Sequence, residues 1–117
     1  MTSTSSEPAT GPIQPEDNIL TAGPIRVDLL RYEARLRGRE IRLTTREFEL
    51  LVFLIRKRGL VAGADEISDS VWHGPTNTNT VTVHINRLRV KLGDDPHHGI
   101  MIRTVRGVGY RLAPSLC

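Results

Sequence analysis

The sequence has one cysteine among its 117 residues, and that cysteine, Cys117, is the last residue. A disulfide within the chain is therefore impossible, and so is a zinc site built from several cysteines. Long apolar runs are also missing: the longest, residues 50–55, has six residues, whereas a membrane-spanning helix needs about 20. The N-terminus lacks the basic start and the apolar stretch of a secretory signal. These absences predict a cytoplasmic protein without membrane contact.

Catalytic and metal-binding patterns are absent as well. The serine, histidine and aspartate residues show no spacing that pairs a nucleophile with a base. Four histidines are present, but none has a helical i, i+4 histidine partner, and no group of cysteines accompanies them: His73, His84, His97 and His98. Gly107-Val108-Gly109 is not followed by a predicted helix, as a nucleotide-binding glycine loop requires. We therefore expect no enzyme activity, no cofactor and no metal ion.

Aromatic residues make up only 4% of the sequence, which argues against single-stranded nucleic acid held by base stacking. Acidic residues are unevenly distributed: residues 70–93 contain none, whereas residues 1–18 contain three and no Lys or Arg. Because the whole chain carries +3, the −3 of residues 1–18 leaves +6 for residues 19–117. The acid-free block indicates either a surface for an anionic partner or a solvated face that happens to lack acids. Charge alone does not decide between them.

The chain divides into a tail and one compact domain. Residues 1–18 are rich in Ser, Thr, Pro and acids with almost nothing to bury, and we predict a disordered tail or linker there. Residues 19–113 are predicted to form the domain, and residues 114–117 a short tail. Within the domain, residues 19–43 hold short apolar pieces separated by turn signals at Gly23-Pro24 and Gly38. This pattern predicts three or four short antiparallel strands.

A buried central helix is predicted next. Thr44 and Glu47 have the spacing of a capping box, with the threonine at the N-cap and the glutamate three residues later. The helix should end near Arg58-Gly59. It is apolar nearly all round, so we expect other elements to cover it on two sides.

Two further helices and a hairpin complete the predicted domain. The second helix spans about Ala64–Trp72, and the third about Thr78–Leu92 with Gly93 as its C-cap. The hairpin consists of the strands Met101–Val105 and Gly109–Leu112. Strands, three helices and a terminal hairpin together indicate the α+β class.

The third predicted helix has two faces at the 3.6-residue period. One is an apolar stripe of Val81, Ile85, Leu88 and Leu92. The other holds amides, valines and arginine without acids, and basic groups follow its edges: Asn79, Val83, Asn86, Arg87 and Val90 on the face, His84, Arg89 and Lys91 at the edges. Arg can bond guanine bidentately, Asn can bond adenine bidentately, and Val can contact a thymine methyl, while edge cations suit phosphates. The composition favours recognition of double-stranded DNA over a solvated face.

The predicted hairpin offers a second DNA-contacting element. Gly107 and Gly109 permit a tight turn, and Arg106 lies at its tip. An arginine on a narrow loop suits the minor groove, whose negative potential attracts it. An ordinary hairpin with a charged tip would have the same pattern, so this signal is weak alone.

Four segments follow one another with specific gaps: Leu43–Leu51, Val71-Trp72, Thr80–Asp95 and Ile102–Leu112. They resemble the C-terminal effector domain of the OmpR/PhoB family of bacterial response regulators, over about residues 19–112. The resemblance implies a winged helix-turn-helix with an N-terminal four-stranded antiparallel sheet, three helices and a C-terminal β-hairpin wing. It also implies sequence-specific binding of double-stranded DNA and transcription regulation, with the third helix in the major groove and the wing at the neighbouring minor groove.

Carried over by position, the resemblance places Val83 and Arg87 at bases. His84, Asn86 and Arg89 would lie at or near phosphates, and Thr104 and Arg106 would belong to the wing contact. The full set predicted to contact DNA is Asn79, Thr80, Val83, His84, Asn86, Arg87, Arg89, Val90, Lys91, Thr104, Arg106 and Tyr110. The resemblance also implies contact with RNA polymerase through the loop between the second and third helices, which consists of His73, Gly74, Pro75, Thr76 and Asn77.

The resemblance further implies that two domains bind direct repeats head to tail. Since the sequence has no heptad seam, we expect a monomer in isolation that pairs on DNA, in the cytoplasm and associated with the nucleoid. Three positions depart from the family pattern: Thr82 stands where an acid is common, Asn86 where Arg is frequent, and Gly63 where a hydroxyl residue usually caps the second helix.

The alternative function, from another class, is a winged helix that docks RNA polymerase or a sigma factor as a protein-interaction module. The acid-free third helix favours DNA, because a protein-docking face would more often mix charges and expose larger apolar groups.

Overall fold

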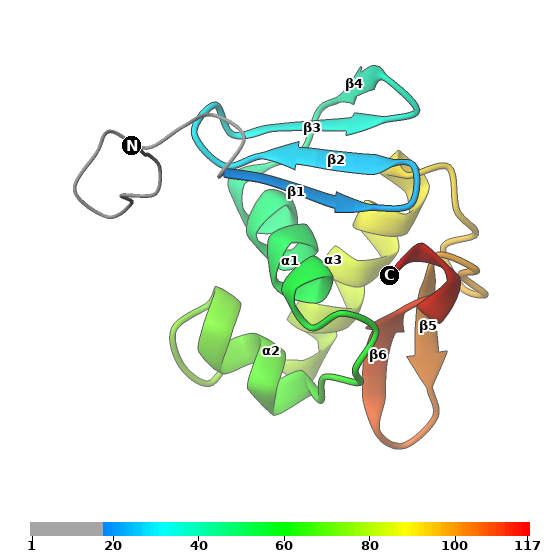
Figure 1. Ribbon diagram of the computed structural model, residues 1–117. Coiled ribbons are helices and arrows are strands. Elements are labelled where there is room, and N and C mark those ends of the chain that lie inside the picture. The colour runs from blue at the N-terminus through cyan, green and yellow to red at the C-terminus, as the bar shows by residue number, and fades with distance from the viewer. Residues whose placement is uncertain (1–17) are drawn as a thin grey trace, which may run out of the picture.

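The computed structural model describes residues 18–117, so the predicted tail, apart from its last residue, lies outside the described residues. Four short strands form an antiparallel sheet in chain order: β1 (Ile19–Ala22), β2 (Ile25–Asp28), β3 (Glu33–Leu36) and β4 (Arg39–Ile41). Three helices follow, and then a two-stranded hairpin: α1 (Thr45–Arg56), α2 (Ala64–Val71), α3 (Thr78–Lys91), β5 (Ile102–Val105) and β6 (Gly109–Leu112). Figure 1 shows the sheet over one end of the helical layer and the hairpin beside it. The predicted order and fold class are confirmed, with four strands at the N-terminus.

The period-2 alternation of the strands decides which face of the sheet is buried. Ile25 and Val27 of β2 are fully buried, whereas Arg26 between them is exposed. The register pairs Arg26 with Arg35 of β3, so both arginines lie on the solvent face of the sheet. The apolar face packs towards α1, which Figure 1 places beneath β1 and β2.

α1 is the central helix, as its sequence predicts. The capping box is present: the backbone N–H of Glu47 donates to Thr44 Oγ1 over 3.2 Å, and the Thr44 N–H donates to Glu47 Oε1 over 3.0 Å. The side chains of Leu50, Leu51 and Leu54 are fully buried, and the helix contacts β1, α2, α3 and β6. It ends at Arg56, slightly before the predicted Arg58-Gly59.

α2 and α3 begin where the sequence places them. Gly63 is the N-cap of α2 and provides no side-chain hydrogen bond, whereas the Asn77 side chain caps α3 by accepting from the Asn79 N–H over 2.8 Å. Ile67 and Val71 of α2 face inward. No helix among residues 18–117 is long and apolar enough to cross a membrane.

The C-terminal hairpin is antiparallel and pairs Ile102 with Leu112 and Val105 with Gly109. It begins at Ile102, one residue after the predicted start. Beyond β6, the residues predicted as a tail, 114–117, continue into a short 3-10 helix, Pro114–Leu116. Leu116 is half-buried and packs against the core, so this segment belongs to the packed domain.

Candidate nucleic-acid interface

α3 has the two faces that its sequence predicts. Its buried stripe consists of Val81, Ile85, Leu88 and Leu92, each at most 1% exposed. On the other side of the helix, Val83 and Val90 are 41% and 58% exposed. Asn79 and Arg87 are exposed as well. Two exposed valines among polar groups are unusual on a helix face that only meets solvent. The same combination suits contact with the edges of base pairs, which offer both polar groups and methyl groups.

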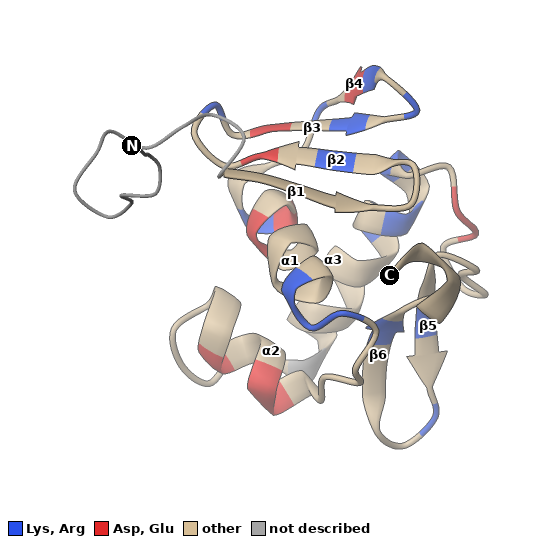
Figure 2. Cartoon of the chain, viewed as in Figure 1, with Lys and Arg blue, Asp and Glu red and all other residues tan. Residues whose placement is uncertain are grey.

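The exposed face of α3 is free of negative charge. α3 contains no acidic residue, and its last turn holds Arg89 and Lys91. In Figure 2 basic residues mark the end of α3 nearest the sheet, and acidic residues lie on α1, on α2, on strands of the sheet beside basic ones, and in the loop that follows α3. An anionic ligand would therefore meet no carboxylate from α3 itself.

Arg89 lies in the interior rather than at an exposed edge of α3. It is 2% exposed. Its Nε donates to the Ile102 carbonyl over 2.9 Å, and Nη1 donates to the Pro96 carbonyl over 3.1 Å. The remaining bonds join Nη2 to Thr104 Oγ1 at 2.8 Å and Nη1 to Asn86 Oδ1 at 3.3 Å. These contacts leave the guanidinium no open side for a phosphate, so we do not keep the predicted direct contact of Arg89.

Lys91 is engaged with an acid on α1. Its Nζ lies 2.6 Å from Glu47 Oε1, and the Glu47 side chain is almost fully buried whereas that of Lys91 is partly exposed. Burial alone would raise the pKa of Glu47, but the bonds from Lys91 and from the Thr44 N–H outweigh it and hold the pKa below its usual value. The ammonium therefore stabilises the α1–α3 contact, which the sequence did not predict.

His84 and Thr80 lie one turn apart on α3, and both are half-buried. The Nδ1 of His84 lies 2.8 Å from the Thr80 carbonyl oxygen. Since that carbonyl can only accept, this hydrogen bond requires the proton to be on Nδ1. The imidazole and Trp72 rings are nearly perpendicular, with centroids 4.9 Å apart, and the Arg46 guanidinium lies 5.9 Å from the centre of the same indole. Trp72 therefore anchors the end of α2 between α1 and α3.

The tip of the β5–β6 hairpin, which is the predicted wing, is exposed to solvent. Arg106, Gly107 and Val108 are all exposed, and Val108 is 59% exposed. Gly107 has a φ of +76°, a backbone conformation that favours glycine. A Cβ added there would have no atom within 4 Å. The predicted tight turn with an arginine at the tip is confirmed; its contact with DNA remains a prediction.

The base of the wing is fixed to the rest of the domain. Ala62, in the segment between α1 and α2, exchanges two backbone hydrogen bonds with Tyr110, of 2.8 and 2.9 Å. A Cβ on Gly109 would collide with the Ala62 carbonyl, so only glycine fits there. The Tyr110 hydroxyl lies 3.1 Å from Thr82 Oγ1 on α3. Tyr110, predicted to contact DNA, is thus half-buried and also joins β6 to α3.

The loop between α2 and α3, predicted to contact RNA polymerase, is held at one point. The Ser68 hydroxyl donates to the Gly74 carbonyl, and the Gly74 N–H donates to the Ser68 carbonyl over 3.4 Å. His73 and Pro75 are exposed, and Thr76 and Gly74 are half-buried. The loop is accessible to a partner; no observation tests which partner binds it.

The loop that joins α3 to β5 is organised by carboxylates. Asp94 accepts from the backbone N–H groups of Ile100, Met101 and Ile102, at 2.8 to 3.2 Å. Burial of Asp94 opposes its ionisation, but these bonds prevail and lower its pKa. Among the described residues no group of three His, Cys, Asp or Glu side chains could hold a metal ion.

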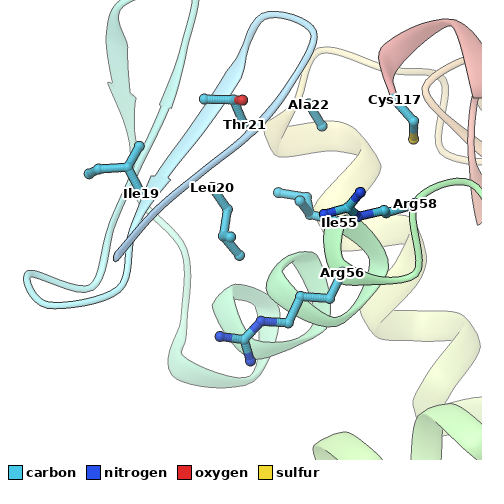
Figure 3. Close-up of a pocket in the computed structure, with 8 residues that line it drawn as sticks. All are labelled: Ile19, Leu20, Thr21, Ala22, Ile55, Arg56, Arg58 and Cys117. Carbon is cyan, nitrogen blue, oxygen red and sulfur yellow. The ribbon is translucent and has the colours of Figure 1, made fainter. Parts of the chain in front are cut away.

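One hollow lies away from this surface. It has a volume of about 680 Å³ and opens between β1 and the C-terminal end of α1 (Figure 3). No residue of α3, β5 or β6 lines it; the lining residues are Ile19, Leu20, Thr21, Ala22, Ile55, Arg56, Arg58 and Cys117.

The residues predicted to contact DNA lie on α3 and on the β5–β6 hairpin, and they differ in how exposed they are. The exposed ones are Asn79, Val83, Arg87, Val90, Lys91, Thr104 and Arg106; the half-buried ones are Thr80, His84, Asn86 and Tyr110; Arg89 is buried. The supporting residues Thr82, Ala62 and Glu47 were not predicted. Only Glu47 carried a local signal, through the capping box, because the other contacts join distant segments.

Comparison with known proteins identifies the family. The protein family described as "Transcriptional regulatory protein, C terminal" matches residues 38–112 of this chain. Sensory transduction protein RegX3 of Mycolicibacterium smegmatis is 39% identical over 99 residues, which is 83% of this chain and 43% of that protein. DNA-binding response regulator MtrA of the same organism is 39% identical over 98 residues, or 82% and 43%.

Solved structures of similar fold belong to the same kind of DNA-binding domain. The Klebsiella pneumoniae RstA DNA-binding domain, crystallised with the RstA box, has a TM-score of 0.76 and 28% identity, and the match covers 82% of this chain and 97% of that one. Response regulator DrrB of Thermotoga maritima, described as an OmpR/PhoB homologue, has a TM-score of 0.73 and 30% identity, covering 82% and 44%.

The fold and its exposed helix define a winged-helix domain of a transcription regulator. The chain belongs to the OmpR/PhoB family of C-terminal DNA-binding domains, as its sequence predicts. It spans 43% of the length of RegX3 and of MtrA.

Proposed function

We propose that this chain binds double-stranded DNA sequence-specifically and thereby regulates transcription, with α3 in the major groove and the β5–β6 wing at the adjacent minor groove. The observation that carries the proposal is the exposed face of α3, where Val83, Arg87 and Val90 are accessible and no acid is present. The major groove is about 12 Å wide and admits an α-helix. The RstA and AdeR domains, which have the same fold, were crystallised with DNA.

In this arrangement Arg87 and Val83 contact base edges, and Arg106 enters the minor groove. Arginine offers two parallel donors to guanine, and valine a methyl group to thymine. Asn79, at the first turn of α3, and Lys91, at the last, lie towards the two flanking backbones, where contacts set register rather than specificity.

Three further statements belong to the same proposal. The chain is monomeric in isolation and pairs head to tail on direct repeats. The loop of residues 73–77 contacts RNA polymerase. The protein acts in the cytoplasm on the nucleoid, without catalysing a reaction. The alternative of a module that docks only proteins has no support among the relatives.

The experiment is selection of bound sequences from a random duplex library with the full 117-residue chain. We expect one half-site motif, recovered as tandem copies in one orientation at a fixed spacing. Arg26→Ala is the matched control, because it removes a cation from the solvent face of the sheet, and it should select the same motif. Failure to enrich any motif would refute the proposal, and binding that does not weaken with salt would exclude phosphate contacts.

A further inference from the structure

The hollow between β1 and the C-terminal end of α1 takes no part in the surface proposed to contact DNA, yet its lining is that of a binding site. Its apolar floor comes from both elements, with Leu20 and Ala22 on β1 and Ile55 on α1. Figure 3 shows Leu20 pointing from β1 towards α1. Because β1 is an edge strand of the sheet, no strand among residues 18–117 closes the hollow on that side. A volume of about 680 Å³ lies in the range of ligand-sized pockets.

The charged side chains that line this hollow are all basic. Arg56 ends α1 and Arg58 follows it two residues later; both are exposed, and no ion pair among residues 18–117 includes either. Glu49 lines a neighbouring hollow together with Arg56, but its carboxylate is paired with Arg46. An apolar floor flanked by two cations without ion-pair partners favours an occupant that is both anionic and partly apolar.

The residues that precede Asn18 in this chain have that chemistry. Residues 1–17 contain three acids, no Lys or Arg, and one large branched apolar side chain, that of Ile13. The segment also starts from the right place, because it is joined through Asn18 to Ile19, which lines the hollow. Ile13 precedes Ile19 by six residues. Six residues of extended chain reach up to roughly 20 Å, and four strand residues span about 13 Å, so Ile13 can reach any part of the floor.

We propose that this hollow binds the chain's own N-terminal segment, residues 1–17. Ile13 packs on the apolar floor, and the carboxylates of Glu16 and Asp17 face the two arginines. Exposed ion pairs are individually weak, but a tethered segment meets its site at a high effective concentration, so weak contacts suffice. No residue of α3, β5 or β6 lines the hollow. Docking therefore leaves the proposed DNA surface open, and the inference does not depend on the proposed function.

A second copy of the chain is the competing occupant, because α2 carries exposed acids at Asp65, Glu66 and Asp69. Glu66 is already paired with Lys57, and a second copy lacks the covalent tether that makes weak contacts sufficient. These two differences favour the N-terminal segment.

Cys117 reports on the hollow without a label, because it is the only cysteine, is exposed and lines the hollow. The measurement is the rate at which the full chain reacts with N-ethylmaleimide, an uncharged thiol reagent. Glu16→Gln combined with Asp17→Asn should release the segment and raise this rate roughly two- to fivefold, the range for loss of one or two exposed ion pairs. Asp65→Asn combined with Asp69→Asn is the matched control, because it removes the same charge from α2, and it should react like the wild type.

Arg56→Gln combined with Arg58→Gln completes the comparison. This change should raise the rate more in the wild-type background than in the background that lacks both acids, because the two pairs of substitutions break the same contact. Any effect of the arginines on the thiol itself is common to both backgrounds and cancels. Equal effects in the two backgrounds would overturn the proposal. A control that reacts faster than the wild type, or a rate that falls with protein concentration, would assign the hollow to a second copy and overturn it as well.

A second measurement needs no variant. In the wild-type chain we expect nuclear Overhauser contacts between the methyl groups of Ile13 and those of Leu20 or Ile55. Their absence would overturn the proposal even if the thiol rates agreed with it. Both measurements are made without DNA, so a chain that binds no duplex would refute the proposed function and leave this inference standing.

Discussion

Lys91→Ala would leave a buried carboxylate without its cation. The Glu47 side chain is 2% exposed and Lys91 Nζ lies 2.6 Å from its Oε1. Breaking a fully buried pair by removing one partner costs roughly 3–5 kcal/mol. The Lys91 side chain is 36% exposed, so solvent screens part of the interaction, and the Thr44 N–H still donates to the carboxylate. We therefore expect the free energy of unfolding at pH 7 to fall by about 2 kcal/mol.

The pH dependence has a definite sign. The pKa of Glu47 is lowered in the folded wild-type protein, so its ionisation adds stability above the unfolded pKa, and this is lost as the pH falls through the folded pKa. Without Lys91, burial dominates and raises the folded pKa, so ionised Glu47 opposes folding. The difference between wild type and variant should thus be largest near neutral pH and shrink as the pH falls through the lowered pKa of Glu47 in the folded wild-type protein, below which Glu47 is protonated in both.

The assay is urea unfolding of four proteins: wild type, Lys91→Ala, Glu47→Gln and the double variant. The amide introduced by Glu47→Gln can still accept from the Thr44 N–H but carries no charge, so Lys91→Ala should cost much less in that background. A difference below about 0.5 kcal/mol between the wild type and Lys91→Ala, the range of ordinary surface substitutions, would refute the buried ion pair.

Three further predictions concern α3 and the wing. Arg87→Ala should weaken binding to the selected motif by about 1–3 kcal/mol through one base position; equal weakening on random duplexes, measured by titration, would make Arg87 a phosphate contact instead. Arg106→Ala should keep the unfolding midpoint and lose most affinity on operators with A·T-rich flanks, where a narrow minor groove concentrates negative potential; wild-type affinity on both A·T- and G·C-rich flanks would contradict the groove contact. Gly109→Ala should destabilise the domain by about 1–3 kcal/mol, because its Cβ meets the Ala62 carbonyl, and should cost more than Gly107→Ala in thermal unfolding; the reverse order would contradict the fixed base of the wing.

Local rules predicted most of the secondary structure. The capping box of Thr44 and Glu47 placed the start of α1, and the 3.6-residue stripe of α3 gave both its core face and its exposed valines. These features depend on residues a few positions apart, which is the range over which sequence periodicity carries information.

The roles of Arg89 and Lys91 could not be predicted in this way. Their partners lie up to 44 positions away in sequence, and nothing in a helical period shows where a long side chain ends. Arg89 did carry one signal: it follows Ile85 by four residues and precedes Leu92 by three, which places it beside the buried stripe. A basic residue at such a position can turn inward as well as outward. Composition favoured an outward side chain, and tertiary packing turned it inward.

The wing combines a fixed base with a bare tip, and this division bears on recognition. Its base is held by the Ala62–Tyr110 backbone pair, by Tyr110 to Thr82, and by Arg89 to Thr104. These contacts join the hairpin to two other segments, so the hairpin cannot rotate about one of them without breaking another. The separation between α3 and the wing is consequently set before any ligand arrives, and binding need not order it. Variation in what the domain recognises is then confined to side chains that no structural contact engages, those on the exposed face of α3 and at the tip of the hairpin.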